Sequence, residues 1–340
     1  MRPIARPLIT SLVSASLILT TAVDARAADE TSAVADEIAE TVAAAIPEHG
    51  SIVGDAEIVA GEVQMELPAG DVMVPIDPEQ SIVISAGAQE DAPLSVALPT
   101  EVEVEHATIA DDGTIVYEAV DGGADVAVQV LDDASARIMT VIPDASASRK
   151  YTYDLAIPTD AVVTEGEDGS MLFTTPDGDW LGGVAAPWAT DANGSPVPTR
   201  YRIEGSALVQ EVDFTNTTAF PVVADPWLGK ALFKSITRKS MGSWWKVSAD
   251  KSAWGLVIHR PTPDGLAIMH TAGWNEIQSK YPHTVRLVTF RQQYQCHVAG
   301  GYGHIAGDWN LEGNRPARTI RGWVWGVERH RCNWETPDRY

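Results

Sequence analysis

Cysteine is almost absent from this sequence, with two residues, Cys296 and Cys332, in a chain of 340. Two cysteines are too few for a small disulfide-dense scaffold or for a four-cysteine zinc ribbon. Lysine and arginine are also scarce, 24 against 47 aspartates and glutamates, so the formal net charge is −23. Hydrophobic residues still make up 45% of the chain, which excludes a disordered polypeptide and is enough for two ordinary cores.

The sequence also lacks an apolar run of the roughly 20 residues that a membrane-spanning helix needs. The apolar stretch over 8–23 follows two arginines and precedes the small-residue motif Ala25-Arg26-Ala27. This order is typical of a secretory signal peptide. We therefore predict a signal peptide over 1–27, cleaved after Ala27, and a secreted mature protein in a compartment where two cysteines pair. An uncleaved N-terminal anchor is the alternative.

The charge changes sign near residue 227. Residues 28–227 contain 38 aspartates and glutamates against five lysines and arginines, a net charge of −33. Residues 228–340 contain eight acidic and 16 basic residues, a net charge of +8. Nine of the eleven tryptophans also lie from Trp227 onward. Opposite charge and different aromatic content indicate two domains, with a boundary near Asp225-Pro226.

Short alternating strands are expected to dominate the acidic region. A helix over 29–46 comes first, because apolar side chains recur there at helical spacing. Turn clusters such as Asp121-Gly122-Gly123 then separate short runs of β-branched and aromatic residues. This regular spacing predicts an all-β, antiparallel, sandwich-like domain. The strands that we expect include residues 82–84, 101–104, 114–117, 126–130 and 151–153.

The basic region is predicted to be a small α+β domain. Its first segment is expected to link the two regions and to contain a short amphipathic helix over 228–241. The other expected elements are strands over 243–249 and 253–260 and helices over 265–281, 284–299 and 319–331. The predicted organisation is a signal peptide (1–27), a helical lead segment (28–50), an acidic β-sandwich-like domain (51–226), a basic linker or amphipathic segment (227–244) and a basic, tryptophan-rich α+β domain (245–340).

Cys296 and Cys332 are expected to form a disulfide that closes a loop of 35 residues. On the chain-entropy model such a crosslink stabilises the fold by about 3–4 kcal/mol. The alternative is a zinc site that combines these cysteines with His297, His304 and His330. Adjacent Cys-His pairs do not match the usual spacing of zinc ligands. We therefore expect no metal and no cofactor.

Two parts of the chain resemble known actinobacterial families. The run over 114–130, the Tyr-Thr-Tyr strand at 151–153 and the motif over 220–226 are similar to a β-domain of large surface and secreted proteins. In those proteins the β-domain precedes repeat arrays or toxin-like modules. The resemblance covers about 50–226 and implies a carrier or scaffold role without catalytic residues.

The second resemblance lies in the basic region. It rests on the motif from Tyr294 to Gly301, the motif from Asp308 to Glu312 with Arg315-Pro316, and Cys332-Asn333. Over about 245–334 the chain resembles a secreted actinobacterial family known as domain-of-unknown-function family 2599. The resemblance implies export and a small domain with paired cysteines, and it implies no established reaction.

Catalytic motifs are missing from the sequence. It contains no G-x-S-x-G elbow, no P-loop and no H-E-x-x-H motif. An enzyme would have to use His297 as a general base, with Asp308, Glu312 and Arg315 as the other candidates. A secreted hydrolase or toxin-like effector that uses His297 is therefore the alternative to a protein without enzymatic activity.

Binding has the more direct physical basis. A basic region rich in tryptophan suits an anionic cell-envelope polymer or an anionic lipid surface. Nucleic acid is not expected, because no recognised binding motif is present. The acidic domain is expected to act as a scaffold, or as a mask that contacts the basic domain until release at an exposed joint within 224–239. The expected surface-binding residues are Lys234, Arg238, Lys239, Trp244, Trp245, Lys246, Trp323 and Trp325.

Overall fold

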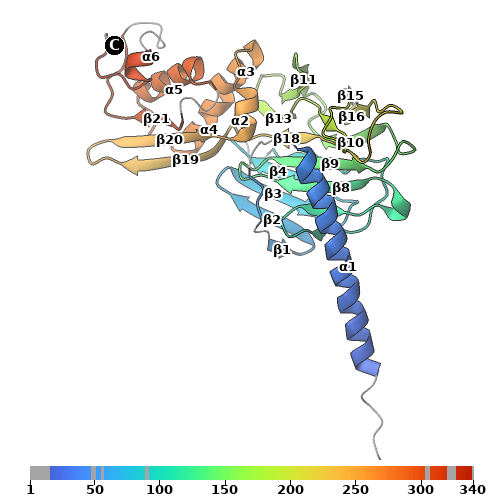
Figure 1. Cartoon of the computed structure of the whole chain (residues 1–340). Helices are drawn as coiled ribbons and strands as arrows, with labels where there is room; N and C mark the ends of the chain where they lie inside the picture. The colour runs from blue at the N-terminus through green and yellow to red at the C-terminus, as the bar shows by residue number, and fades with distance from the viewer. Residues whose placement is uncertain are drawn as a thin grey trace, which may run out of the picture.

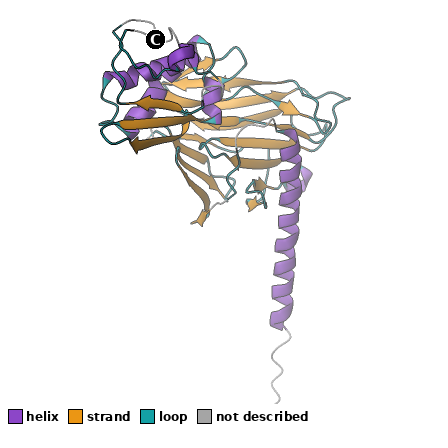
Figure 2. Ribbon diagram, turned by 60° about the vertical axis from the view of Figure 1, so that its left-hand side comes forward, coloured by secondary structure: helices purple, strands orange, loops and turns teal. Residues whose placement is uncertain are grey.

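The computed structural model describes residues 16–46, 51–54, 57–88, 92–302, 307–319 and 327–338. Antiparallel strands dominate these residues and form two large sheets and one small sheet. The helices gather near the two ends of the chain, apart from a 3₁₀ turn at Val120–Gly122 (Figures 1 and 2). The predicted antiparallel, sandwich-like body is confirmed.

The first sheet contains most of the early strands. Its strands are β1 Glu57–Val59, β2 Glu62–Leu67, β3 Gly70–Pro75, β4 Ile82–Ala86, β5 Leu94–Val96, β10 Lys150–Ala156, β15 Thr199–Glu204 and β16 Ala207–Val212. They lie in the order β1-β2-β3-β4-β5-β10-β16-β15, and all neighbours are antiparallel. Along β4, Ile82 and Ile84 are buried while Val83 between them is partly exposed, which is the alternation expected of a strand with one buried face.

The second sheet packs against the first. Its strands are β6 Thr108–Ile109, β7 Ile115–Tyr117, β8 Asp125–Val130, β9 Ala136–Ile142, β11 Val162–Glu165, β12 Met171–Thr174, β13 Trp180–Val184, β14 Ala189–Thr190, β17 Val222–Ala224 and β18 Trp227–Gly229. The main path is β11-β12-β13-β18-β9-β8-β7-β6, and β17 joins β14 to β9. The strand expected over 101–104 is wrong, because only the single bridge Val104–Ala119 forms there.

Helix α1, Ser16–Ala45, covers the outer face of the second sheet with its C-terminal part. Ala35 and Val42 are fully buried against Val116 and Ala127, which point away from the core between the sheets. The first half of α1 extends beyond the sheets (Figure 1). The helix expected over 29–46 is therefore confirmed and begins earlier. Among the described residues, no helix is both long and apolar enough to cross a membrane.

The C-terminal part contains the third sheet and the remaining helices. Its elements are β19 Phe233–Ser240, β20 Trp245–Lys251, α2 Ala253–Ile258, α3 Pro263–Ile268, a π turn Met269–Gly273, α4 Trp274–Lys280, α5 Val288–Gly300, β21 Trp309–Glu312 and α6 Val327–His330. Helices α2 to α5 lie on one side of β19-β20-β21 (Figure 1). The helices expected over 265–281 and 284–299 are confirmed with shifted ends. In the described part of 319–331, only α6 is helical.

Helix α2 replaces a predicted strand over 253–260. The Ser252 hydroxyl caps the helix by accepting from the Gly255 N–H at 2.6 Å. The carboxylate of Asp133, in the turn between β8 and β9, accepts from the Trp254 N–H at 3.0 Å. These two acceptors satisfy N–H groups of the first turn, which have no partner inside a helix. The second acceptor is 121 residues away, so local sequence patterns did not reveal it.

The amphipathic helix expected over 228–241 is also wrong. Its first residues form β18, and its last residues form β19. The register of β19 against β20 shifts between Phe233 and Ser235, which is a β-bulge. The bulge places Phe233 and Ile236 on the same face although they are three residues apart. This spacing imitates helical periodicity, which explains the error.

One apolar cluster joins the sandwich to the C-terminal part. It includes Leu172 and Trp180 of the second sheet together with Phe233 and Trp254. The rings of Trp227 and Trp254 meet edge to face with centroids 5.8 Å apart. Residues 224–233 are all buried, so the exposed joint expected within 224–239 is wrong over this stretch. Residue 227, where the net charge along the sequence changes from negative to positive, therefore lies in a packed core.

Candidate surface-binding site

The strands β19 and β20 form a hairpin that projects beyond the sandwich on the left of Figure 1. Its turn is closed by a hydrogen bond from the Met241 N–H to the Trp244 carbonyl at 2.9 Å. Gly242 has φ +86°, a left-handed conformation that glycine adopts without strain. The turn therefore holds Met241, which is 42% exposed, at the tip.

The inner face of the hairpin holds an exposed tryptophan in place. Val247 and Ala249 are fully buried on this face, and nearer the tip the same face carries Arg238 and Trp245. The Arg238 guanidinium lies 4.4 Å from the Trp245 ring centroid and 5.2 Å from that of Tyr281. Arg238 Nη1 also donates to Thr284 Oγ1 at 3.1 Å. Trp245 stays 41% exposed, with one side against a cation.

The outer face of the hairpin carries two lysines. Lys239 lies directly opposite Lys246 in the antiparallel register, and Lys246 lies opposite Glu312 of β21. The Glu312 carboxylate is already bound to Arg315, with an Nη2–Oε2 distance of 2.6 Å. In the described part of the chain, neither lysine makes an ion pair.

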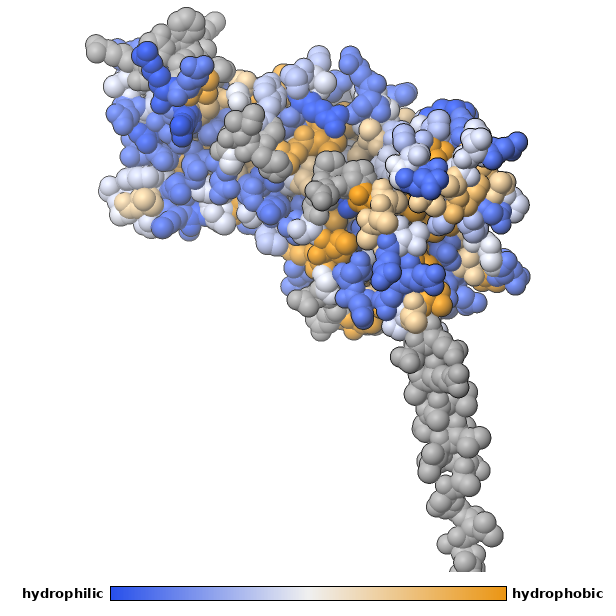
Figure 3. Space-filling view, in the orientation of Figure 1, coloured by the Kyte–Doolittle hydropathy of each residue, from blue (hydrophilic) through white to orange (hydrophobic). Residues whose placement is uncertain are grey.

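Exposed apolar side chains gather at the same end of the molecule. The described residues include eight large hydrophobic residues that are exposed, and four of them are Met241, Trp245, Leu287 and Val288. Leu287 is the N-cap residue of α5 and Val288 is its first residue. Thr284, three residues before Leu287, accepts a hydrogen bond from Arg238 of the hairpin at 3.1 Å, which brings the start of α5 to this end. In Figure 3 this end is largely hydrophilic with a small apolar spot.

We call this surface the hairpin end. It comprises four exposed or half-exposed cations and four exposed apolar side chains. Its residues are Arg238, Lys239, Met241, Trp245, Lys246, Arg286, Leu287 and Val288.

The other predicted surface residues lie elsewhere. Lys234 is paired with Asp132 of the β8–β9 turn, at 3.4 Å, and with Asp250, at 3.7 Å. Asp132 is the main cause of the raised pKa of Lys234. This lysine therefore fastens the hairpin base to the sandwich. Trp244 is half-buried in the turn. Trp323 and Trp325 lie outside the described residues.

His297 is packed inside the C-terminal part. It is 6% exposed, and its ring is stacked on Trp309 with centroids 5.4 Å apart. Burial lowers the pKa of His297 to about 4, so the imidazole is neutral at neutral pH and a weak base. Its Nε2 atom is buried and makes no hydrogen bond within the described structure. A cavity of about 410 Å³ lies beside it and is also lined by Glu328 and Arg331.

The other catalytic candidates are not assembled around His297. Glu312 and Arg315 bind each other, and the Glu312 N–H donates to the Gln293 side chain at 2.8 Å. Asp308 is exposed. No hydrogen bond or ion pair joins any of these three to His297 in the parts of the chain that the structure describes.

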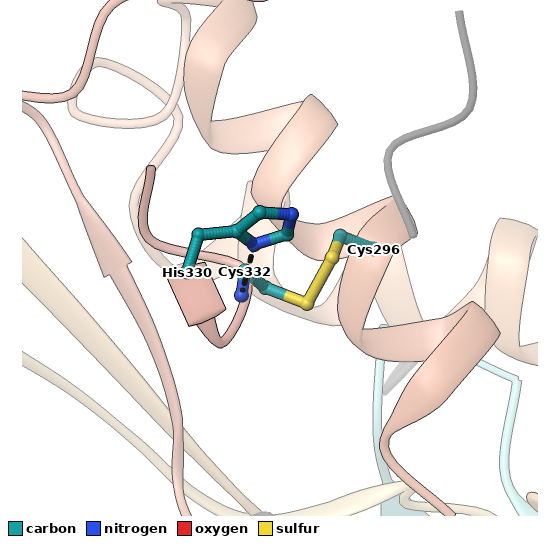
Figure 4. The surroundings of a disulfide bond; sticks show 3 residues. All are labelled: Cys296, His330 and Cys332. Atoms are coloured by element: carbon teal, nitrogen blue, oxygen red, sulfur yellow. Dashed lines mark hydrogen bonds between the residues drawn. A yellow bond between two sulfur atoms is a disulfide. The ribbon is translucent and has the colours of Figure 1, made fainter. Parts of the chain in front are cut away.

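The predicted disulfide between Cys296 and Cys332 is confirmed. It ties α5 to the segment after α6, and the Cys332 N–H donates to Nδ1 of His330 at 2.9 Å (Figure 4). The two sulfur atoms that the zinc alternative needs are bonded to each other. No cluster of three or more His, Cys, Asp or Glu side chains able to hold a metal occurs among the described residues, and His304 lies outside them.

Sequence reasoning missed two buried titratable groups. Lys251 donates to the Gly301 carbonyl at 2.8 Å and contacts Nδ1 of His259 at 3.1 Å, and burial lowers the pKa of Lys251 to about 8. Glu276 accepts from the Leu232 N–H at 2.8 Å and from the Phe233 N–H at 3.1 Å. Both groups satisfy the backbone of distant segments, and local sequence patterns carry no signal for such contacts.

Comparisons with protein-family models, with curated proteins and with solved structures find no match for this chain. Positive charge and exposed apolar side chains occur together at the hairpin end. His259, Glu276 and His297 are buried.

Proposed function

We propose that this protein is a secreted, non-enzymatic binding protein whose hairpin end docks on an anionic lipid surface. The observation that carries the proposal is the presence of four cations and four exposed apolar side chains on one projecting end. The signal-peptide pattern over 1–27 supports export.

A lipid surface fits the hairpin end better than an anionic polymer does. Each lysine or arginine close to an anionic leaflet contributes about 1 kcal/mol, so four contribute about 4 kcal/mol, which alone gives weak binding. Met241, Trp245, Leu287 and Val288 add apolar surface that a lipid interface removes from water and that a hydrated polymer leaves exposed. Trp245 is suited to the interface, because its ring is apolar and its N–H is polar.

We further propose that the sandwich is a scaffold for this surface. Support comes from the exposed tip, which extends away from the acidic sheets (Figure 1). Two ion pairs, Lys234 with Asp132 and Arg260 with Asp168, connect the C-terminal part to turns of the second sheet. A protease would have to open the central strand β18 to separate the two parts, which disfavours a mask that is removed by cleavage.

Vesicle co-sedimentation of the mature chain tests the proposal. We expect binding to vesicles that contain 30% phosphatidylglycerol, weak binding to phosphatidylcholine, and a loss of affinity at high salt. Trp245→Ser should weaken binding several-fold, whereas Val162→Ser, which changes an exposed apolar residue on β11, should not. Equal binding to both vesicles, or stronger binding to an anionic polysaccharide than to vesicles, would refute a lipid-docking function.

A further inference from the structure

The outer face of the hairpin places two like charges against each other. Directly opposed residues of an antiparallel pair have Cβ atoms about 4.5–5.5 Å apart and point to the same side, so Lys239 and Lys246 project together. Like charges in this arrangement destabilise a hairpin. Thr237, two residues before Lys239, is exposed on the same face and adds a hydroxyl donor.

Neighbouring carboxylates do not neutralise this pair. Glu312, beside Lys246, is bound to Arg315. Asp250 lies on the same face at the hairpin base, where it contacts Lys234 at 3.7 Å. The pair is therefore a concentrated positive charge within the described structure, two residues from the apolar tip at Met241.

We propose that Lys239 and Lys246 together clamp one phosphate group of a lipid headgroup. This inference rests on the proposed function and names the chemical group that the hairpin end recognises. Two ammonium groups and a hydroxyl match the three terminal oxygens of a phosphomonoester, which carries a charge between −1.5 and −2 near pH 7. A phosphodiester offers one charge and two free oxygens, so it satisfies the pair less well. A phosphomonoester lipid such as phosphatidic acid is the preferred headgroup.

Paired lysines and independent lysines predict different binding. We would measure binding of the mature protein to vesicles of phosphatidic acid and of phosphatidylglycerol with matched zeta potential. The variants are Lys239→Met, Lys246→Met and the double variant. Arg286→Met is the matched control, because it removes a cation at the same end but outside the pair. Circular dichroism melts establish that each variant is folded.

If the two lysines form a clamp, the wild type should bind phosphatidic acid vesicles about 5- to 10-fold more tightly than phosphatidylglycerol vesicles. Either single lysine variant should lose this preference, and the double variant should bind only slightly more weakly than the single variants. Arg286→Met should weaken binding to both lipids and keep the preference. Independent charges predict no headgroup preference and losses that multiply, about 5-fold for each cation. That result would overturn the clamp and leave the proposed function standing. Absence of binding to either anionic vesicle would overturn both.

Discussion

Glu276 is expected to make the stability of this protein fall as the pH rises. The side chain is 5% exposed and accepts the N–H groups of Leu232 and Phe233, where the chain passes from the sandwich into the third sheet. Burial raises the pKa of Glu276 to about 8, against the lowering effect of these two hydrogen bonds and of Lys230 and Lys280. We predict that Glu276→Gln removes most of this pH dependence.

The direction of this pH dependence follows from the protonation of Glu276 in the folded and unfolded states. The unfolded chain releases this proton near pH 4.5, while the folded protein keeps it up to about pH 8. Between these values unfolding releases a proton, so a rise in pH favours unfolding. The contribution is complete below pH 4.5 and is lost as the pH approaches 8. At 1.36 kcal/mol for each pKa unit, the full change is at most about 5 kcal/mol.

Urea denaturation of the wild type and Glu276→Gln at pH 5, 6.5 and 8 measures this effect. The wild type should lose stability relative to the variant over this range, because glutamine does not titrate. Glu79→Gln, which replaces an exposed glutamate in a turn, controls for the removal of one surface carboxylate. A constant difference between wild type and Glu276→Gln from pH 5 to pH 8, or a difference of opposite sign, would refute the reasoning.

Three further variants test the packing and the disulfide. His297→Ala should lower the free energy of unfolding by about 2–4 kcal/mol, because it removes a buried ring. It should leave vesicle binding of the folded protein unchanged. Loss of a hydrolytic activity at unchanged stability would instead favour a catalytic histidine. Replacing Cys296 and Cys332 by serine should cost about 3–4 kcal/mol, and reductant should then have no further effect. Gly229→Ala should lower the free energy of unfolding by about 1–3 kcal/mol, because the new Cβ would lie 2.6 Å from Cγ of Trp254. Thermal or urea denaturation measures this change, and an unchanged stability would show that the contact relaxes.

Local patterns in the sequence predicted most of the strands correctly. The runs over 114–117, 126–130 and 151–153 lie within or overlap β7, β8 and β10, because alternation and turn residues are local signals. The disulfide was predicted correctly because the chain has only two cysteines. The segment over 228–241 was not, because a bulge in β19 imitates helical spacing and because β18 pairs with strands far away in the sequence.

The amino-acid composition predicted many residues of the hairpin end, but it could not predict which face of the hairpin each one occupies. Charge and aromaticity predict Lys239, Trp245 and Lys246 as surface-binding residues, and they do lie at one end of the molecule. Their division into an inner and an outer face depends on the register of β19 against β20. Lys234 has the same composition signal, yet its partner Asp132 is 102 residues away and fixes it at the hairpin base. Leu287 shows no charge or motif that sequence reasoning could use.

The acidic and basic parts of the chain share one core, so their opposite charges make one molecule with a negative body and a positive end. Residues 28–227 carry a net charge of −33, and they belong largely to the sandwich, which shares a core with the basic part. In the proposed docking, an anionic lipid surface repels this acidic body and attracts the hairpin end, which favours the orientation with the hairpin end toward the membrane. Screening over about 8 Å at physiological ionic strength confines the attraction to groups near the surface. The acidic sheets therefore weaken every other approach, and the proposed docking gains an orientation that a uniformly basic protein would not have.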